Sequence, residues 1–243
     1  MKAVILARAG SITIVDLMHD IAPFSITEGG FWLAQSYAYF PEGTVHIAVI
    51  DPGVGSQRRL LGACSNGHYF LAPDNGLLDQ VVIETERVAY RFLDISYLSN
   101  LLQFGLVSNT FHGRDIFAPI AAALVTGQCQ FDNLGPVTSD IVRTDIKAPQ
   151  KSAQYIAGTI ITIDHYGNLI SNISPSDSEY TQTAWVDCKG QRISLRKTYS
   201  DGANGEIIAL INSFSVLEIA QTQGNAAKTL GIDRGEPIRL MLE

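Results

Sequence analysis

Asp51 directly follows the apolar run Val45–Ile50 and opens the glycine-containing segment Asp51–Arg58. If the run is a buried strand, Asp51 stands at the carboxyl edge of a sheet, where α/β proteins bind their ligands. Asp-Pro-Gly is also ordinary turn chemistry, in which the aspartate only caps the turn. The pattern therefore indicates a reactive carboxylate or, as the alternative, a tight turn.

The glycines after Asp51 do not fit a phosphate-binding loop. Such a loop leads into the N-terminus of a helix, where backbone N–H groups cradle the anion. Here the segment leads into an apolar run that starts at Leu60, and the G-x-G-x-x-G spacing is absent. We therefore exclude a phosphate cradle at this position.

His112 belongs to a second candidate segment, Thr110–Asp115, which lies just before a predicted helix. A histidine beside a glycine at the start of a helix is exposed enough to meet a substrate, and it titrates near neutral pH. The alternative is a structural histidine, with Asp115 acting as the N-cap of the helix. The residue types alone do not decide between these interpretations.

Asp164, Asn168 and Glu218 are the remaining polar candidates. Asp164 and Asn168 lie where a predicted strand runs into a polar turn, and an Asx-rich hairpin turn explains this run equally well. Glu218 stands between apolar residues, so strand alternation turns it either to solvent, which is the default expectation, or into a site. The histidines and acids are not spaced as metal ligands, so we predict no metal site.

The first 140 residues alternate between helical and strand patterns, which predicts an α/β domain. We expect helices over 1–9, 27–40, 75–83 and 115–126, and strands over 11–17, 45–50, 60–65, 68–72 and 88–92. Asn66-Gly67, between two of these strands, is a two-residue turn signal for an antiparallel hairpin. The first strand, the helix over 27–40 and the strand over 45–50 together predict a β-α-β unit.

The periodicity fades between residues 128 and 153, and we expect a domain boundary there. We assign residues 1–140 to the α/β domain, 141–154 to a linker and 155–243 to a second domain. Short strands dominate the second domain, at 155–163, 183–187, 192–196, 207–211 and 238–242. Because Gly, Asn and Asp turns separate them, they predict a small antiparallel barrel or sandwich.

The composition limits the class of protein. The chain has 17 Lys and Arg against 24 Asp and Glu, a formal net charge of -7, so the basic surface that nucleic acid requires is not expected. The cysteines, Cys64, Cys129 and Cys188, lack C-x-x-C spacing and are expected to be reduced thiols. No apolar run is long enough to span a bilayer, and Arg8 interrupts the apolar start before a signal peptide forms. We therefore predict a cytoplasmic protein without nucleic-acid or membrane partners.

In their order along the chain, these segments resemble the S-adenosylmethionine (SAM) hydroxide adenosyltransferase family. The family is also called DUF62 and is related to fluorinating and chlorinating enzymes that attack the same substrate. The resemblance covers nearly the whole chain and rests on several blocks of sequence. The blocks are 40–45, 51–55, 73–78, 111–115, Asp164 with Gly167-Asn168, Asn212-Ser213 and 224–227.

The resemblance implies that the chain hydrolyses SAM to adenosine and methionine, with SAM as the substrate and no cofactor. It places the family's hydrolytic triad on Asp51, Arg58 and His112. It also implies a set of residues that contact the nucleoside or methionine parts of the substrate. This set is Phe24, Asp164, Asn168, Ser213, Glu218 and Ala226.

The same resemblance implies a Rossmann-like mixed sheet in the first domain, an all-β barrel in the second, and a homotrimer. The sites of the trimer are expected between the first domain of one subunit and the second domain of the next. Family members usually begin with a strand whose aspartate holds the ribose hydroxyls, whereas this sequence opens on the predicted helix 1–9. We therefore expect the first domain to lack that strand. The alternatives are a SAM-dependent halogenase and a catalytically inactive nucleoside-binding trimer.

Overall fold

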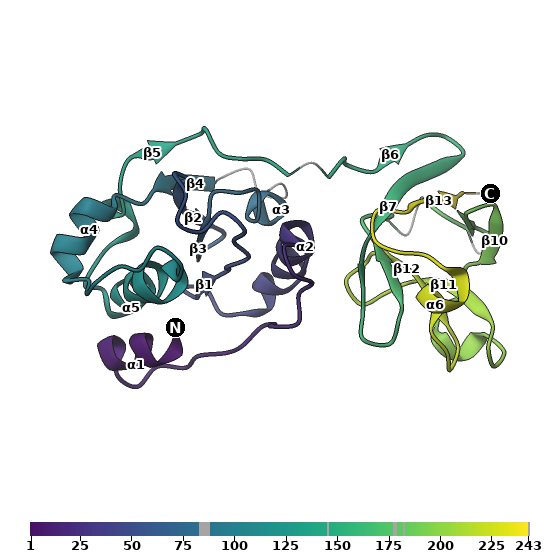
Figure 1. The fold of residues 1–243 in the computed structure, drawn as a ribbon. Helices are drawn as coiled ribbons and strands as arrows, with labels where there is room; N and C mark the ends of the chain where they lie inside the picture. Colours follow the sequence, from purple (N-terminus) through teal and green to yellow (C-terminus); the bar gives the residue numbers. More distant parts are fainter. Residues whose placement is uncertain (83–87, 145, 177–178, 182, 243) are drawn as a thin grey trace. The chain divides into compact units, whose positions relative to one another are not determined.

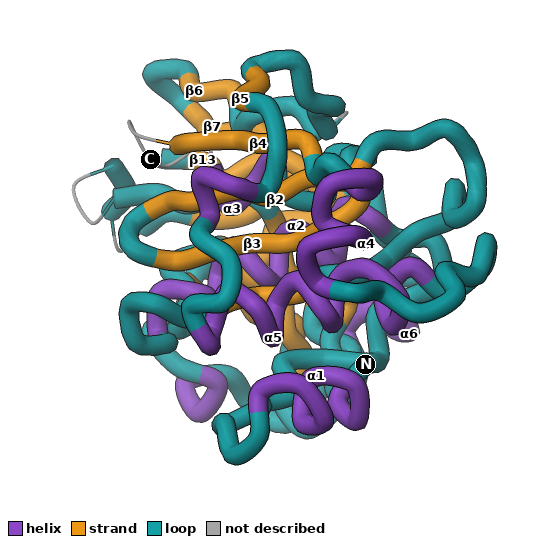
Figure 2. The backbone as a smooth tube through the Cα atoms, turned by 90° about the vertical axis from the view of Figure 1, so that its left-hand side faces the viewer, coloured by secondary structure: helices purple, strands orange, loops and turns teal. Residues whose placement is uncertain are grey.

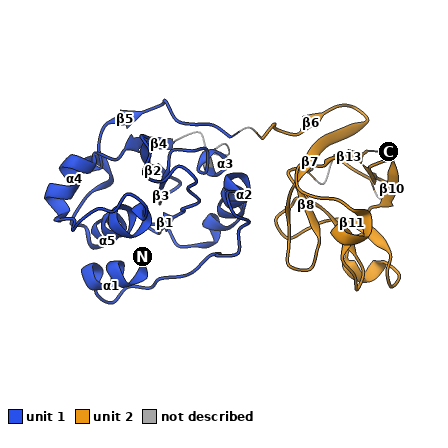
Figure 3. Cartoon of the chain, in the orientation of Figure 1, with its two compact units in different colours: residues 1–145 blue, residues 146–243 orange. Residues whose placement is uncertain are grey.

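A computed structural model describes residues 1–82, 88–144, 146–176, 179–181 and 183–242 of the chain. The chain forms two compact units, residues 1–145 (unit 1) and 146–243 (unit 2), which are coloured separately in Figure 3. The change from one unit to the other falls inside the 141–154 segment. Each unit has its own sheet and its own buried apolar core.

Unit 1 combines one mixed sheet with helices (Figures 1 and 2). Its helices are α1 (Lys2–Ala9), α2 (Ile26–Ser36), α3 (Asp79–Val82), α4 (Ile95–Leu102) and α5 (Ala118–Thr126). Its strands are β1 (Val45–Ile47), β2 (Leu60–Ser65), β3 (His68–Pro73), β4 (Val88–Phe92) and β5 (Val137–Thr138). The strand order is β1-β3-β2-β4-β5, in which β1 and β3 pair in parallel and the other neighbours are antiparallel.

The structure confirms the hairpin predicted around Asn66-Gly67. Strands β2 and β3 pair from Leu60 opposite Pro73 to Ser65 opposite His68. Asn66 and Gly67 have φ values of 47° and 76°, which are the positive values that a tight two-residue hairpin turn requires at both central positions. The register of the two central strands is therefore set locally by this turn.

The predicted strand over residues 11–17 is wrong, and the β-α-β unit that depended on it is not formed. The segment leaves α1 and runs to α2 without belonging to a described helix or strand. Ile12 and Ile14 pack on the core beside α1 and α5, while Thr13 and Val15 are exposed. The segment therefore has the side-chain alternation of a strand but no strand beside it.

Helix α5, predicted over 115–126, packs against the sheet through a shared apolar cluster that includes Leu60 and Leu71. Its residues from Ala118 to Ala123 are buried, and Gly127 ends the helix in the left-handed region with φ 72°. A short π-helical turn, Gly113–Phe117, precedes α5 and replaces the first turn predicted for this helix. The expected helix over 75–83 is also shorter, because the structure shows α3 only over Asp79–Val82; residue 83 lies outside the described residues.

A pair of histidines is buried in the core of unit 1. His46 on β1 and His68 on β3 are 8% and 4% exposed, and His46 Nε2 lies 3.2 Å from His68 Nδ1. The ring of Phe70 stacks on His46 with centroids 5.0 Å apart, and Tyr37 and Phe40 meet the pair edge-on. Burial, together with the neighbouring His68, lowers the pKa of His46 from 6.5 to about 4. His46 is therefore uncharged at neutral pH.

Acid should destabilise unit 1 through His46. Because folding lowers its pKa, the unfolded chain binds this proton more tightly, so stability is full above pH 6.5 and falls between 6.5 and about 4. At 1.36 kcal/mol per pKa unit, the difference between 6.5 and about 4 corresponds to about 3 kcal/mol, of which about 2–3 kcal/mol should be lost by pH 4.5. Urea unfolding at pH 7 and pH 4.5 measures the loss, which should be smaller in His46→Phe. Equal acid sensitivity of the two proteins would contradict this prediction.

Unit 2 is built on one sheet that nearly closes on itself, which confirms the all-β character predicted for this half. Its strands are β6 (Gln150–Lys151), β7 (Tyr155–Ile163), β8 (Leu169–Ser171), β9 (Trp185–Cys188), β10 (Gln191–Ser194), β11 (Ile207–Ile211), β12 (Leu217–Gln221) and β13 (Pro237–Met241). They pair antiparallel in the order β10-β9-β13-β7-β8-β12-β11, with β6 beside β7. Leu195, just after β10, bridges to Ala209 of β11 and joins the two ends of the sheet.

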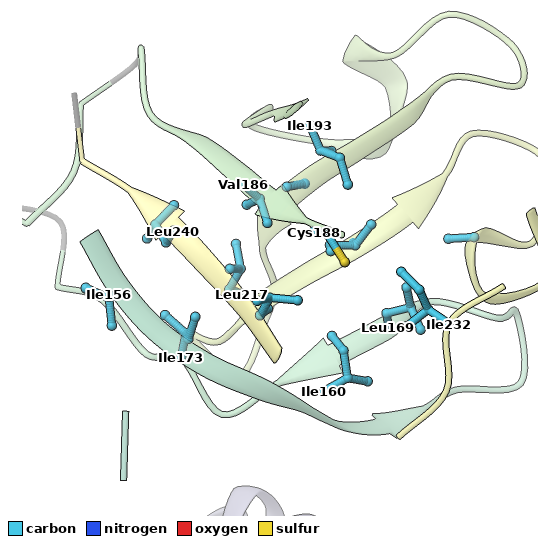
Figure 4. Close-up of a cluster of buried hydrophobic side chains, with 14 of the residues drawn as sticks. Ile156, Ile160, Leu169, Ile173, Val186, Cys188, Ile193, Leu217, Ile232 and Leu240 are labelled. Atoms are coloured by element: carbon cyan, nitrogen blue, oxygen red, sulfur yellow. The ribbon is translucent and has the colours of Figure 1, made fainter. Parts of the chain in front are cut away.

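The interior of unit 2 is filled by aliphatic side chains from several strands, with Leu217 and Leu169 fully buried (Figure 4). The short helix α6 (Ala226–Leu230) adds Ala226 to this core. The structure thus places a barrel-like antiparallel unit after the mixed-sheet unit. No helix in the described parts of the chain has the length and apolar character needed to cross a membrane.

Candidate active site

The strand predicted over 45–50 is shorter in the structure, where β1 ends at Ile47, and Asp51 lies in the segment that follows the carboxyl end of β1. The side chain of Asn75, just after the neighbouring strand β3, holds this segment, since its Nδ2 donates to the carbonyl oxygen of Ile50 at 2.8 Å. Within the loop, Ser56 Oγ donates to the carbonyl oxygen of Gly53 at 2.7 Å. Hydrogen bonds on both sides therefore fix the backbone that carries Asp51.

Asp51, Arg58 and His112 form one hydrogen-bonded group, although 54 residues separate Arg58 from His112. Arg58 Nε donates to Asp51 Oδ1 at 2.5 Å, and Arg58 Nη2 donates to Asp51 Oδ2, so the ion pair is bidentate. The side chain of Asp51 is only 5% exposed and that of Arg58 only 10%. Arg58 Nη2 also lies 3.1 Å from His112 Nδ1. The guanidinium thus links the carboxylate to the imidazole.

Arg58 keeps one donor free of protein partners. Its Nη1 is buried and has no hydrogen-bond partner among the described residues. A buried donor left unpaired costs about 1–3 kcal/mol of stability, and such groups concentrate where a ligand completes the bonding. Arg58 Nη1 is therefore positioned to bind an oxygen atom of a ligand or a water molecule.

The contact with Arg58 fixes the tautomer of His112. A guanidinium has only donors, so His112 Nδ1 accepts from Arg58, and the proton of the neutral ring resides on Nε2. Burial, and after it the charge of Arg58, lowers the pKa of His112 below its ordinary value of 6.5, against smaller opposing effects of Asp51 and Asp115. At neutral pH, His112 therefore offers an uncharged Nε2–H donor.

Gly55 lets the loop of Asp51 lie directly against the loop of His112. Gly55 has φ 81°, and a Cβ atom at this position would collide with the backbone carbonyl oxygen of Asn109. Only glycine adopts this conformation without strain and allows so close a backbone approach. The packing of these two loops is what brings Asp51 and Arg58 to His112.

Gly55→Ala should separate the two loops and lower the rate of any reaction that uses all three side chains by at least about tenfold, since small misplacements of reacting groups can cost about a hundredfold. Gly53→Ala is the matched control, because a Cβ at Gly53 meets its nearest neighbours at an ordinary 3.5 Å. Steady-state rates of the two variants and of wild type measure the effect. Similar rates for both variants would show that the close approach is unimportant.

Asp164 and Asn168 come together in the turn between β7 and β8 of unit 2. Asn168 Nδ2 donates to Asp164 Oδ2 at 2.9 Å, and the backbone N–H groups of Tyr166 and Asn168 donate to Asp164 Oδ1 at 2.9 Å. This is the Asx-rich turn offered as the alternative explanation, and it holds the Asp164 carboxylate in one orientation. Both interpretations of the sequence are compatible with this geometry.

Glu218 is buried, so the default expectation that it faces solvent is wrong. Its side chain on β12 is 3% exposed and accepts hydrogen bonds from Tyr199 Oη at 2.6 Å and from Asn212 Nδ2 at 3.0 Å. Burial raises the pKa of Glu218, and the charge of Asp164 adds to this effect. Asp164 and Glu218 therefore belong to one electrostatic cluster of unit 2.

Tyr199 and Asn212 are members of this cluster that the sequence did not identify as candidates. Asn212 lies in a turn after β11, and Tyr199 lies in a short 3-10 turn with no apolar or polar periodicity. Burial, followed by its hydrogen bond to Glu218, raises the pKa of Tyr199. The sequence carries no signal for either residue, because the burial of Glu218, which requires nearby donors, is visible only in the structure.

The remaining candidates lie in different settings. Ser213 is exposed in the turn after β11, next to Asn212, and Ala226 is fully buried at the start of α6. Phe24 belongs to unit 1, where it is 75% exposed and has φ 66°. A phenylalanine in this conformation is uncommon and is often associated with function.

Unit 1 therefore contains the Asp51, Arg58 and His112 group, and unit 2 contains the Asp164, Asn168 and Glu218 cluster with Ser213 nearby. Among the described residues, no three His, Cys, Asp or Glu side chains are grouped as metal ligands. The unit 1 group combines a carboxylate, a free guanidinium donor and a neutral imidazole. Such a group can orient a water molecule and accept its proton.

Comparison with family models gives two matches that together cover most of the chain. The model of the SAM hydroxide adenosyltransferase N-terminal domain matches residues 1–135. The model of the C-terminal domain of the same family matches residues 158–239. The two matches lie in unit 1 and unit 2 respectively.

Curated relatives match the chain over nearly its full length. A protein named (R)-S-adenosyl-L-methionine hydrolase from Thermus thermophilus is 32% identical over 99% of this chain and 92% of its own length. A protein of the same name from Methanocaldococcus jannaschii is 30% identical over 94% of this chain and 82% of its own length. A fluorinase from an Actinoplanes species is 27% identical over 96% of this chain and 89% of its own length.

The fold is also similar to solved structures. The structure of an uncharacterised conserved protein from Thermotoga maritima has a TM-score of 0.88 and 29% identity, over 98% of this chain and 92% of that one. The structure of a conserved hypothetical protein from Thermus thermophilus has a TM-score of 0.79 and 30% identity, over 98% of this chain and 91% of that one. The pairing of a mixed-sheet unit with a barrel-like unit is therefore shared with these proteins.

Proposed function

The chain belongs to the SAM hydroxide adenosyltransferase family, and we propose that it hydrolyses S-adenosyl-L-methionine to adenosine and L-methionine. The observation that carries the proposal is the buried Asp51, Arg58 and His112 group with its free Arg58 Nη1 donor. This group fits the chemistry of the reaction named for the curated relatives. We also propose that the unit 1 sheet is Rossmann-like and that the unit 2 barrel is fully closed.

The substrate sets what the enzyme must do. The sulfonium of SAM is already a good leaving group at the 5′ carbon, so the main task is to align a nucleophile behind that carbon. A water oxygen forms the new C–O bond at the 5′ carbon while the C–S bond breaks. The electron pair of the C–S bond passes to the sulfur, which leaves as the neutral thioether of methionine. The proton lost by the water must leave through the protein or solvent.

The triad supplies these functions through side chains of two contacting loops. As the water gives its proton to Asp51, His112 Nε2–H and Arg58 Nη1 donate to the oxygen and stabilise its hydroxide character, and the electron pair released from the O–H bond attacks the 5′ carbon. Asp51 accepts the departing proton, since each oxygen retains a lone pair beside its bond to Arg58. In this proposal, neither a metal nor a cofactor takes part.

Asp164, Asn168, Ser213, Glu218, Ala226 and Phe24 are proposed to contact the nucleoside and methionine parts of the substrate. Asp164 suits the cationic α-amine of the methionine part, because a carboxylate and an ammonium form a charge-assisted hydrogen bond. The rigid turn around Asp164 keeps this carboxylate in one orientation before substrate binds. A preoriented group loses less conformational freedom on binding.

Incubation of the purified protein with SAM, followed by chromatography, tests the function. Adenosine and methionine should appear in equal amounts, and the rate should be unchanged by a metal chelator. The same incubation with chloride or fluoride should give no halogenated nucleoside, because the Asp51 carboxylate repels a halide in the position of the water. A halogenated product would favour the halogenase alternative, and binding of adenosine without turnover would favour an inactive nucleoside-binding protein.

We further propose a homotrimer whose sites combine unit 1 of one subunit with unit 2 of a neighbour. Phe24 of unit 1 and Tyr166, in the Asp164 turn of unit 2, are large side chains that are each about three-quarters exposed. Such exposed side chains are common where subunits meet. Light scattering of the purified protein measures the number of subunits directly.

Mixing two inactive variants tests whether the sites are shared. Asp51→Asn impairs unit 1 and Asp164→Ala impairs unit 2, so each pure variant should have little activity. After unfolding and refolding together, random assembly in a closed trimer should restore about a quarter of the wild-type sites. Activity that stays at the level of the pure variants would show that each subunit supplies a whole site.

A further inference from the structure

Asp115 lies three residues after His112 and takes no part in the mechanism derived above. The sequence offers it as the N-cap of a helix, but the structure places it inside the π-helical turn Gly113–Phe117, whose N-cap is His112. The side chain of Asp115 is only 11% exposed. A carboxylate so little exposed needs hydrogen-bond donors, and here they come from the loop before the turn and from a neighbouring arginine.

The carboxylate of Asp115 reaches back across the loop to Ser108. Asp115 Oδ2 accepts a hydrogen bond from the backbone N–H of Ser108 at 2.9 Å, over seven residues of sequence. Ser108 Oγ in turn accepts from the backbone N–H of Phe111 at 3.1 Å. The two hydrogen bonds together hold residues 108–111 as a closed turn, and His112 follows this turn directly.

Arg114 holds Asp115 in the orientation that the contact with Ser108 requires. Arg114 Nε donates to Asp115 Oδ1 at 2.6 Å, and Arg114 Nη2 donates to Asp115 Oδ2 at 3.0 Å. The guanidinium also lies over the ring of Phe111, 4.9 Å from its centroid. The hydrogen bond to Arg114, followed by that from Ser108, lowers the pKa of Asp115 to about 2. The carboxylate therefore stays charged throughout the neutral range of pH.

The 108–111 turn governs two contacts between the His112 loop and the loop beside it. Asn109 lies within the turn, and its carbonyl oxygen is the atom against which Gly55 packs. His112 follows the turn, and its Nδ1 lies 3.1 Å from Arg58 Nη2. A shift of the turn would therefore move Asn109 away from Gly55 and His112 away from Arg58 at the same time.

We propose that Asp115 is a positioning residue that holds His112 within hydrogen-bonding distance of Arg58. It acts by keeping the 108–111 turn closed, since its own oxygens are already bonded within the loop. Its effect on turnover rests on the function proposed above. Because Asp115 aligns the group that holds the water, it should affect the chemical step more than the binding of SAM.

Two substitutions of Asp115 separate its positioning role from simple loss of the side chain. Asp115→Ala removes the acceptor of the Ser108 N–H, whereas Asp115→Asn keeps one oxygen for it. Asp115→Ala should lower kcat for SAM at least about tenfold and change KM by less than about threefold, because misalignment slows the reaction without removing substrate contacts. Asp115→Asn should recover a large part of the lost kcat. No recovery by Asp115→Asn would contradict the role assigned to the Ser108 contact.

Asp94→Ala is the matched control for stability. Asp94 Oδ1 also accepts from a backbone N–H, that of Tyr97 at the start of α4. Both alanine variants therefore lose a carboxylate that fixes a segment of unit 1, but the contacts described above link only Asp115 to His112. Folded Asp94→Ala should keep the kcat of wild type, with the folded fraction taken from urea unfolding. Equal losses of kcat in the two variants would overturn the proposal.

Ser108→Ala tests the second hydrogen bond of the turn. It removes the acceptor of the Phe111 N–H and keeps the N–H that Asp115 accepts. It should lower kcat in the same direction as Asp115→Ala, and the double variant should lose less than the product of the two single effects, because both act on one turn. Fully multiplied effects would show that Asp115 acts by another route. If Asp115→Ala does not fold, Ser108→Ala provides the same test of kcat.

Nitrogen-15 NMR signals of the His112 ring test the positioning without any turnover. In wild type they should report a neutral ring protonated on Nε2, because Nδ1 accepts from Arg58. In Asp115→Ala or Ser108→Ala they should report a mixture of tautomers, whereas Asp94→Ala should match wild type. This result in a chain that does not hydrolyse SAM would reject the proposed function and support the positioning of His112. Unchanged ring signals in folded Asp115→Ala would overturn the proposal.

Discussion

Asp51→Asn should lower the rate of adenosine release from SAM by about 10²–10⁴-fold, the usual contribution of a positioned base. Asparagine keeps the size of the side chain but cannot accept the proton of the attacking water. It also breaks the bidentate pairing with Arg58, so the guanidinium no longer holds His112 and its own Nη1 in place. Single-turnover chromatography of adenosine measures the chemical step apart from product release.

The same substitution affects stability and therefore needs a matched control. Asp51 and Arg58 are both buried, and breaking a buried ion pair costs about 3–5 kcal/mol. Asp74 is also buried and pairs with Arg59, whose side chain is 40% exposed, so Asp74→Asn removes a partly buried ion pair outside the proposed site. Asp74→Asn should lose stability in urea yet retain turnover while folded. Wild-type turnover by folded Asp51→Asn would remove Asp51 from the mechanism.

Local signals in the sequence predicted the elements that local chemistry decides. Asn66-Gly67 set the β2–β3 hairpin because positive φ at both turn positions depends on these two residues alone. Gly127 ends α5 for a local reason too, because glycine adopts the left-handed conformation of a helix end without strain. Helix α4 was overlooked even though its signals are present. Asp94 caps it by accepting from the N–H of Tyr97, and Leu98 and Leu102 are buried four residues apart.

Tertiary contacts decided the features that the sequence analysis missed. The side chains of residues 11–17 alternate as in a strand, but a strand also needs a neighbouring strand with which to pair. The sequence of the segment does not indicate whether such a neighbour is present. Glu218 is predicted at the surface because the alternating side chains of a strand usually have one solvent-exposed face. Strand β12 lies between β8 and β11, and four of its five residues are buried, so Glu218 bonds to Tyr199 in the interior.

The candidate site likewise combines a feature predicted from local sequence with one that tertiary contacts decide. The apolar run before Asp51 predicted the place of this residue after a strand, whereas Arg58, seven residues further on, was assigned only by the family resemblance. The approach of His112 depends on the contact of two loops around Gly55 and Asn109, which no spacing predicts. Only the resemblance to a family joined His112 to the other two residues before the structure placed Arg58 between them.

His112→Ala should lower kcat/KM for SAM by about 10²–10⁴-fold, and the wild-type rate should fall in acid with the pKa of His112. Burial and the charge of Arg58 place this pKa below 6.5. The neutral ring therefore persists through pH 7, and activity declines only as the pH falls through the lowered pKa. Protonation would put a proton on Nδ1, facing the guanidinium of Arg58 at 3.1 Å, and would break their hydrogen bond.

His112→Gln separates the proposed donor role from the titration. The Gln amide can donate to the water oxygen in place of Nε2–H but does not titrate, so this variant should retain more activity than His112→Ala. Its kcat/KM should also lack the acid decline assigned to His112, when both are measured from pH 5 to 8 at constant ionic strength. If His112→Gln and wild type decline at the same pH, a group other than the imidazole controls the reaction, and the neutral Nε2–H donor is not what holds the attacking water.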